Sequence, residues 1–235
     1  MENHSESEAL TGDFTSSLAG RYGIATNYHA VSHPSIPNYL ALESGSTWGV
    51  TDWRYHQFPA ADLGSELTQR HVPWRAYMEG LGSQGCLNTP LPYDPGHNPF
   101  AFFGSRCPDQ VVPFTRLAGD LHSAAPPAFI WISPDRCHDE HDCPVATGDA
   151  WLRSTVGEIT ASPAWTRGSV LFVTWDEDDY GADNHVLTLV VPAGGGHHVS
   201  ARAYDHYSLL ATVEDLLGVP RLRNSRQAAA MTDLL

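Results

Sequence analysis

Short apolar runs alternate with amphipathic stretches along most of the chain. This is the pattern expected when buried parallel strands alternate with helices. Three runs have the length and the β-branched or aromatic content of buried strands, at residues 128–133, 169–175 and 186–191. A shorter run at residues 24–31 has the same character. The pattern predicts an α/β fold with three α/β/α layers and a mostly parallel central sheet.

Helices are expected where apolar residues recur every three or four positions. Segments with this character are residues 1–20, 38–43, 62–81, 111–123, 148–161 and 204–217. Asp62 is a candidate N-cap, and Pro73 is expected to divide its segment into two helices. Gly45 and Gly218 fit helix ends. Residues 82–110 lack any periodicity, and such a long irregular segment in a compact domain is usually functional, so we expect a substrate-facing loop there.

Composition narrows the class of protein. The chain has 235 residues, 42% of them hydrophobic, which suits one domain over residues 1–235 with a single core. Its net charge of -14 would repel a phosphate backbone, so a nucleic-acid partner is not expected. No apolar run approaches the roughly 18 residues of a transmembrane segment. The 13 histidines would nearly neutralise this charge in acid, which fits an acidic environment or a chance enrichment.

Four cysteines are present, at positions 86, 107, 137 and 143. None forms a C-x-x-C pair, so a structural zinc site is not expected. An even number with short separations fits two disulfides, Cys86–Cys107 and Cys137–Cys143, and these would imply an oxidising compartment. The alternative is four reduced, buried thiols.

Polar side chains follow three of the predicted strands. They are Ser35 after residues 24–31, Asp139 and His141 after residues 128–133, and Asp176 and Glu177 after residues 169–175. Ligands of open α/β sheets bind beyond the carboxyl ends of the strands, so these residues are expected to form one site.

Two of these features have a plain structural alternative. The acidic run at residues 176–179 is either a solvated turn or a site for a hard cation such as Mg²⁺, Ca²⁺ or Mn²⁺, whereas added imidazoles would favour Zn or Fe. Ser35 stands between Pro34 and Pro37, before a predicted helix. Its hydroxyl either caps that helix or faces an anion held at the helix N-terminus.

Residues 32–47 read SHPSIPNYLALESGST. This stretch resembles a hallmark of the phosphoesterase family, which includes bacterial acid phosphatases and phospholipases C and belongs to the alkaline-phosphatase-like superfamily. Seven further blocks follow the family's order over nearly the whole chain. They are ENHS at 2–5, WRAYME at 74–79, HNPF at 97–100, HDEHD at 138–142, TWDE at 174–177, NHV at 184–186 and HYSLL at 206–210.

The resemblance implies an alkaline-phosphatase-like fold and a metal-dependent hydrolase of phosphate esters. Ser35 would be the nucleophile and would form a phosphoserine intermediate. One or more divalent ions (Mg, Ca, Mn or Zn) would be held by Glu2, Asn3, Ser35, Asp176 and Glu177. Candidates for catalysis beside Ser35 are His141 and His185, and candidates for substrate binding are His97, Asn38 and His33. Other hydroxyls, Ser44, Ser46 and Thr47, follow the C-terminal end of the same helix, where the dipole disfavours an anion.

Three functions compete. An acid phosphatase acting on small phosphate esters is preferred. A phospholipase C would need an exposed aromatic rim, for which the candidates are Trp48, Trp53, Tyr55 and Phe58, or Phe100, Phe102 and Phe103. Phospholipases of the family are usually much longer, which favours the phosphatase. The third function is that of a non-catalytic relative with a binding role.

Family members usually carry a hydrophobic strand just before the Glu-Asn pair, which here is Glu2-Asn3. We therefore expect a further strand, and an export signal, upstream of Met1. A secreted or extracytoplasmic location follows from that expectation. If Met1 is the true start, a cytoplasmic location is expected instead.

Overall fold

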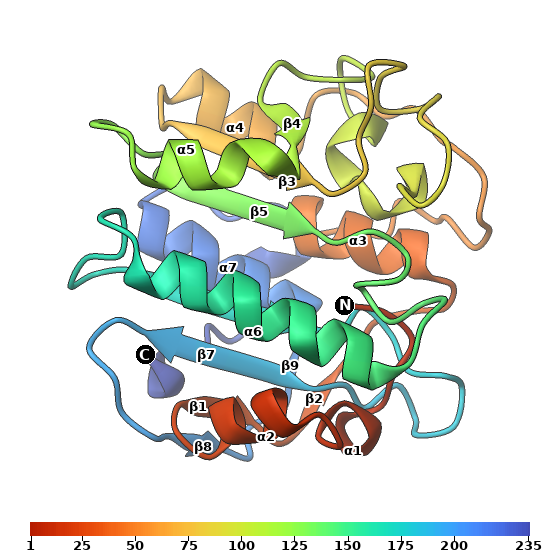
Figure 1. The fold of residues 1–235 in the computed structure, drawn as a ribbon. Helices are drawn as coiled ribbons and strands as arrows, with labels where there is room; N and C mark the ends of the chain where they lie inside the picture. The colour runs from red at the N-terminus through yellow and green to blue at the C-terminus, as the bar shows by residue number, and fades with distance from the viewer.

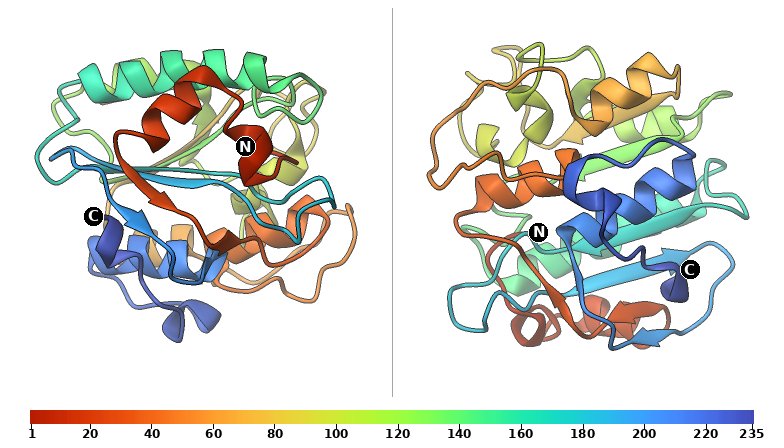
Figure 2. Two further views of the ribbon diagram at one scale, coloured as in Figure 1. Left: turned by 90° about the horizontal axis from the view of Figure 1, so that it is seen from below. Right: turned by 180° about the vertical axis from the view of Figure 1, so that it is seen from behind.

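Two layers of helices enclose the strands in the computed structural model, which describes residues 1–235 (Figure 1). One face is covered by α1 (Glu6–Ala9), α2 (Asp13–Ala19), α5 (Leu117–Leu121) and α6 (Val145–Ala161). The other face is covered by α3 (Ser35–Ser44), α4 (Leu63–Gln69) and α7 (His206–Leu217), as Figure 2 shows. The predicted α/β/α architecture is confirmed.

The strands form three hydrogen-bonded sheets. The first has the order β6 (Val170–Thr174), β7 (Thr188–Pro192), β1 (Gly23–Ala25) and β8 (Val199–Ser200). In it, β7 is antiparallel to both neighbours, and β1 and β8 are parallel. The second, fully parallel sheet has the order β4 (Val111–Pro113), β3 (Trp74–Met78) and β5 (Phe129–Ser133). The third is the parallel pair β2 (Tyr28–His29) and β9 (Tyr204–Asp205).

The first two residues join the sheets at the carboxyl ends of β5 and β6. The terminal ammonium group of Met1 donates to the carbonyl of Thr174 (3.1 Å), and the N–H of Asp176 donates to the carbonyl of Met1 (3.0 Å). The N–H of Glu2 donates to the carbonyl of Asp139 (2.8 Å). These bonds place Glu2 beside the polar residues that follow both strands.

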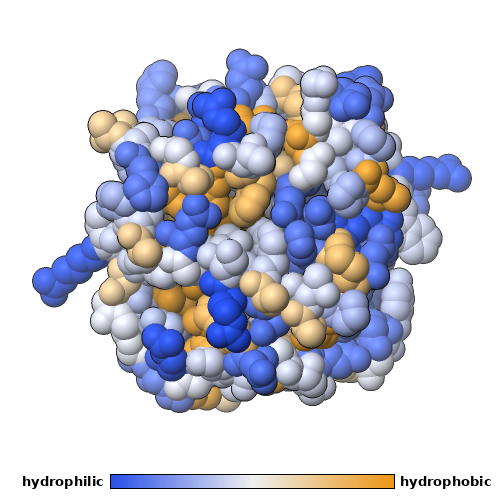
Figure 3. Space-filling model, in the orientation of Figure 1, coloured by the Kyte–Doolittle hydropathy of each residue, from blue (hydrophilic) through white to orange (hydrophobic).

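One hydrophobic cluster of 39 buried residues includes side chains of β3 and β7, so the two larger sheets share a core. On the face of Figure 3, the hydrophobic residues appear mainly in bands on either side of α6, among hydrophilic ones. Residues of β5 and β6 are mostly half-buried, whereas those of β7 are mostly buried. None of the helices combines the length and hydrophobicity needed to cross a bilayer.

Three predicted segments differ from the structure. The second helix expected after Pro73 is wrong, because residues 74–78 form β3 between two parallel neighbours. The helix expected over 111–123 is wrong in its first part: Val111 and Val112 pair with β3, and only α5 is α-helical. The strand expected at 24–31 is divided into β1 and β2. Buried apolar runs of this length satisfy helix and strand equally, and pairing partners decide between them.

Several local predictions are confirmed. Asp62 caps α4 by accepting from the N–H of Ser65, and α3 and α7 end at Gly45 and Gly218, whose φ angles of 73° and 67° are left-handed. The irregular segment 82–110 contains two short 3₁₀ helices, η1 (Pro95–His97) and η2 (Pro99–Phe102). Both predicted disulfides are present, with Cα–Cα distances of 5.4 Å for Cys86–Cys107 and 4.7 Å for Cys137–Cys143.

Candidate active site

Ser35 is the first residue of α3, and Pro34 occupies the N-cap position with extended backbone. The interpretation of Ser35 as a helix cap is therefore wrong, because its side chain makes no capping hydrogen bond. Its buried hydroxyl lies 3.0 Å from Glu2 Oε2 and 3.0 Å from Glu177 Oε1. A hydroxyl has one proton to donate, so two carboxylates compete for it.

The carboxylates of Glu2, Asp176 and Glu177 are all buried. Burial raises the pKa of Asp176 well above its usual value, and repulsion from Glu2 and Glu177 raises it further. Burial, followed by repulsion from Glu2, raises the pKa of Glu177 to about 8. Asp176 Oδ2 has no hydrogen-bond partner. These buried carboxylates repel one another, and their oxygen donors suit a hard divalent cation.

The other two carboxylates of the acidic run differ in role. Asp178 is buried and accepts hydrogen bonds from the N–H groups of Tyr180, Ala182 and Asn184, so it holds the turn after β6. Asp179 is exposed. The first two residues of the run, Asp176 and Glu177, therefore belong to the candidate site, and Asp178 stabilises the turn that follows.

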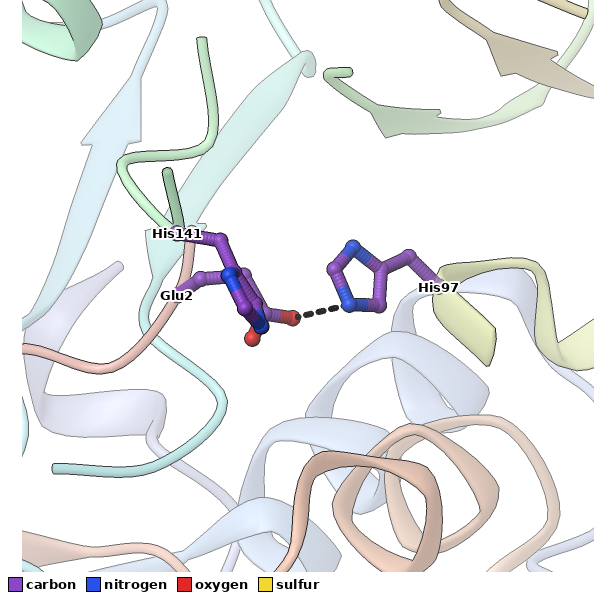
Figure 4. A group of neighbouring side chains, drawn as sticks. All are labelled: Glu2, His97 and His141. Atoms are coloured by element: carbon purple, nitrogen blue, oxygen red, sulfur yellow. Dashed lines mark ion pairs between the residues drawn. The ribbon is translucent and has the colours of Figure 1, made fainter. Parts of the chain in front are cut away.

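Two histidines approach Glu2 from the other side. The carboxylate of Glu2 and the rings of His97 and His141 converge, so that one ligand atom from each lies within 4.8 Å of the others (Figure 4). His97 Nε2 lies 3.3 Å from Glu2 Oε1, and His97 Nδ1 lies 2.9 Å from Asp139 Oδ2. Burial lowers the pKa of His97, but Glu2 and Asp139 outweigh that effect and raise it to about 9. His97 is therefore a cation near neutral pH.

His33 and Asn38 organise the loop before α3. His33 Nδ1 lies 2.7 Å from Glu177 Oε2, and Tyr180 stacks on the ring at 3.9 Å between centroids. The side-chain oxygen of Asn38 accepts from the N–H groups of Val31 and Ser32 (3.1 and 3.0 Å). Both side chains thus hold the neighbours of Ser35 in place.

Two predicted site residues contact other groups. His185 Nε2 lies 2.8 Å from Glu6 Oε2, and its ring stacks on His29, so His185 stands apart from the residues around Ser35. Asn3 contacts Asp176 through its backbone N–H, at 3.4 Å from Oδ1, instead of through its side-chain oxygen.

The sequence-based set lacked two residues that the structure adds. The hydroxyl of Tyr39 donates to Glu2 Oε1 at 2.6 Å, and its ring stacks on His97 at 5.2 Å. The available signal was its position four residues after Ser35, on the same helix face. Arg136 Nη2 lies 2.8 Å from His141 Nδ1 and donates to Asp142 Oδ1 at 2.7 Å. No sequence signal pointed to Arg136.

A cavity of about 710 Å³ opens onto Ser35. Its lining combines polar residues, namely His97, His141, Asp94 and Arg136, with apolar ones, namely Ile36, Trp53, Tyr55, Leu87 and Phe102. Of the two sets of aromatic residues considered for a rim, Trp48 and Phe58 pack on each other, and Phe100 and Phe103 are buried. The cavity has the size of a small-molecule site with one polar end.

The chain is similar to several known proteins. A model of the phosphoesterase family matches residues 5–220. The chain is 32% identical over 243 residues to the phosphatidylinositol-3-phosphatase of Mycobacterium tuberculosis, covering 99% of this chain and 80% of that protein. It is 30% identical over 240 residues to the phosphate-repressible acid phosphatase of Penicillium chrysogenum, covering 94% of this chain. It spans only 58% of the length of that fungal relative.

One solved structure supports the fold. A protein in the alkaline phosphatase superfamily from Vibrio parahaemolyticus superposes with a TM-score of 0.68 and 13% sequence identity. The alignment covers 100% of this chain and 70% of that protein. At this identity the likeness concerns the fold, which is the one that the sequence predicted.

Proposed function

The chain belongs to the phosphoesterase family, and from this premise we propose that it hydrolyses phosphate monoesters, with Ser35 as the nucleophile and with a divalent metal ion. The observation that carries the proposal is the Ser35 hydroxyl, 3.0 Å from the Glu2 and Glu177 carboxylates at the start of a helix. The acid phosphatase and phosphatidylinositol-3-phosphatase names of the relatives support a monoesterase over a phospholipase C.

The residues present fit a metal ion. Glu2, Asp176 and Glu177, with the Ser35 hydroxyl, would hold it, and the unpartnered Asp176 Oδ2 offers it a free oxygen. When bound, the ion supplies positive charge that favours the Ser35 alkoxide and neutralises a phosphoryl group. The oxygen ligands favour Mg²⁺, Ca²⁺ or Mn²⁺, whereas His141 beside Glu2 would add a nitrogen ligand that Zn²⁺ accepts.

The chain's own groups account for the remaining chemistry. The free N–H groups and positive end of α3 bind the phosphoryl oxygens. Ser35 Oγ forms a bond to phosphorus and gives its proton to one of the two carboxylates, and the bond from phosphorus to the leaving oxygen breaks. His141 lines the cavity and can protonate that oxygen. Water then hydrolyses the phosphoserine. Cationic His97 orients Glu2, and His185, which contacts Glu6, is given no step.

A metal-supplemented assay tests the proposal. The purified chain would be given a chromogenic phosphomonoester and, separately, a chromogenic phosphocholine ester, with and without each candidate ion. Turnover of the monoester that needs the ion supports the phosphatase. Preference for the phosphocholine ester would favour a phospholipase C, and absence of turnover with every ion would favour a non-catalytic relative.

The location of the protein follows from its cysteines. We propose an extracytoplasmic site of action, because both disulfides need an oxidising compartment to persist. Thiol-blocking mass spectrometry of the protein from its native compartment would find all four cysteines protected.

A further inference from the structure

Building on the proposed function, we infer that Trp53 selects phosphate esters whose leaving group is planar and aromatic, by stacking on it at the mouth of the cavity. The indole is 74% exposed although it lines the same cavity as Ser35. Its neighbour Tyr55 already packs against Phe102, at 5.2 Å between ring centroids, whereas no aromatic ring packs against Trp53. A large apolar ring exposed at a cavity mouth gains free energy when a flat ligand covers it.

The turn that carries Trp53 is anchored on both sides. The Asp52 carboxylate accepts from the N–H of Arg54 at 3.0 Å and lies 2.8 Å from His56 Nε2. The hydroxyl of Tyr55 donates to the carbonyl of Ala101 at 3.1 Å, and the N–H of Phe58 donates to the carbonyl of Phe102 at 2.7 Å. Little conformational freedom is therefore lost when a ligand contacts the indole, and the stacking free energy is retained as affinity.

Arg136 is the arginine that lines the cavity. The cation of Arg136 is already shared by Asp142, 2.7 Å away, and Asp94, 3.6 Å away. Arg136 therefore offers little free charge to a second anionic group. Ile36, Leu87 and Phe102 also line the cavity and are apolar.

The net charge of the chain disfavours a membrane-bound substrate. A chain of net charge -14 is repelled by an anionic lipid surface, where one exposed tryptophan would contribute little against that repulsion. A small soluble aryl or arylmethyl phosphate could stack on Trp53 and would not require the chain to approach an anionic lipid surface.

Two substrates of similar size and leaving-group basicity isolate planarity: benzyl phosphate and cyclohexylmethyl phosphate. The kcat/KM ratio of benzyl to cyclohexylmethyl would be measured for the wild type, Trp53→Ala and Trp53→Phe. We expect the wild type to prefer benzyl, Trp53→Ala to lower the ratio about tenfold, as loss of one stacking contact does, and Trp53→Phe to keep most of it. Leu216→Ala, which removes an exposed apolar side chain from α7, is the matched control and should keep the wild-type ratio.

Equal ratios in the wild type and Trp53→Ala would overturn the inference while leaving the phosphatase intact. So would a Trp53→Ala defect confined to a phosphoinositide in vesicles, since it would indicate a lipid contact. Calorimetric binding of benzylphosphonate, which cannot be hydrolysed, tests the stacking on Trp53 separately from the proposed phosphatase activity. If neither ester is turned over, the proposed function fails, and binding weakened about tenfold by Trp53→Ala still supports the stacking site. Unchanged binding of benzylphosphonate by Trp53→Ala would refute the stacking site.

Discussion

The groups around Ser35 come from three distant parts of the chain. Glu2 lies at the N-terminus, Glu177 follows β6, and Tyr39 is on the same helix as the serine. Tyr39 and His97 both contact Glu2 Oε1, while the serine contacts Oε2. Both oxygens of Glu2 are therefore fixed by neighbours, and these contacts keep its carboxylate directed at the serine hydroxyl.

Ser35→Ala tests the role of that hydroxyl. It should reduce turnover by orders of magnitude, because the two-step route through the serine is lost. The free energy of unfolding should change by no more than about 1.5–3 kcal/mol, the scale of one hydrogen bond to a charged group. Steady-state kinetics and thermal unfolding in the same buffer measure both quantities.

Ser46→Ala is the matched control, since Ser46 accepts from the N–H of Trp48 beyond the other end of α3. It should keep wild-type turnover. Acid quenching during turnover and peptide mapping should place the phosphate on Ser35. A label on Ser44, Ser46 or Thr47, or near-normal activity of Ser35→Ala, would refute the assignment.

At the scale of elements, the site depends on loops held by covalent and buried polar contacts. The segment between Cys137 and Cys143 carries Asp139 and His141, and its disulfide closes it on itself. The C-terminal segment is held under α7 by Glu214, which accepts from the N–H of Leu222 at 2.7 Å and from the hydroxyl of Ser225 at 2.6 Å. The disulfide shapes the loop that carries site residues, and the hydrogen bonds of Glu214 stabilise the helical layer that contains α7.

The two disulfides should differ in what their removal costs. Replacing Cys137 and Cys143 by Ala should destabilise the chain by about 2 kcal/mol, and replacing Cys86 and Cys107 by about 3 kcal/mol, because the second pair closes the longer loop. The first double variant should nonetheless lose more kcat/KM, since its loop carries His141. Thermal unfolding should therefore show the larger loss of stability for the Cys86 and Cys107 variant, and kinetics the larger loss of kcat/KM for the Cys137 and Cys143 variant. Equal activity losses would mean that the loop keeps its shape without the bond.

Glu214 should make stability depend on pH. Burial raises the pKa of this carboxyl to about 7, although hydrogen bonds from Ser225 and Leu222 oppose the shift. Because the pKa is raised in the folded state, the stabilisation is full below the unfolded value near 4.5 and is lost as pH rises through 7. Glu214→Gln should therefore match the wild type at pH 4.5 and exceed it above pH 8, by at most about 3 kcal/mol.

Glu158→Gln on the exposed face of α6 is the control for that comparison. It should follow the wild type at every pH. Denaturant unfolding from pH 4.5 to 8.5 gives the curves, and parallel curves for Glu214→Gln and the wild type would contradict the prediction.

At the scale of the whole molecule, the carboxylates join segments more than 170 residues apart. Met1 is hydrogen-bonded to Thr174 and Asp176 at the end of β6, and the N–H of Glu2 donates to the carbonyl of Asp139 beyond β5. The mutual repulsion of Glu2 and Asp176 in a buried setting opposes folding, as the raised pKa of Asp176 indicates. A bound cation would turn that repulsion into a crosslink between the two sheets.

Divalent ions should accordingly stabilise the entire chain, and chelation should abolish activity. At a concentration 100 times its Kd, an ion should add about 2.7 kcal/mol to the free energy of unfolding. Asp176→Asn should raise stability in chelator, because it removes a buried charge, while losing most of the response to metal. Glu177→Gln should likewise lose activity. If both variants bind metal and turn over substrate normally, the acidic residues serve only the turn.

The sequence by itself determined the layers, both disulfides and the ends of several helices. Apolar runs such as 170–174 and the left-handed glycines at 45 and 218 act within a few residues, so local pattern is enough to place them. The serine, the carboxylates and His97 were identified because their motifs are local and follow one another in a known order.

Only the tertiary structure decided what those residues contact. Residues 74–78 form a strand because β4 and β5 lie on either side, which no short window contains. Tyr39 and Arg136 join the site, and His185 turns to Glu6, through side-chain contacts that cross 37, 5 and 179 positions of sequence. The direction of a side chain depends on which distant groups pack and pair around it, and that information exists only once the chain has folded.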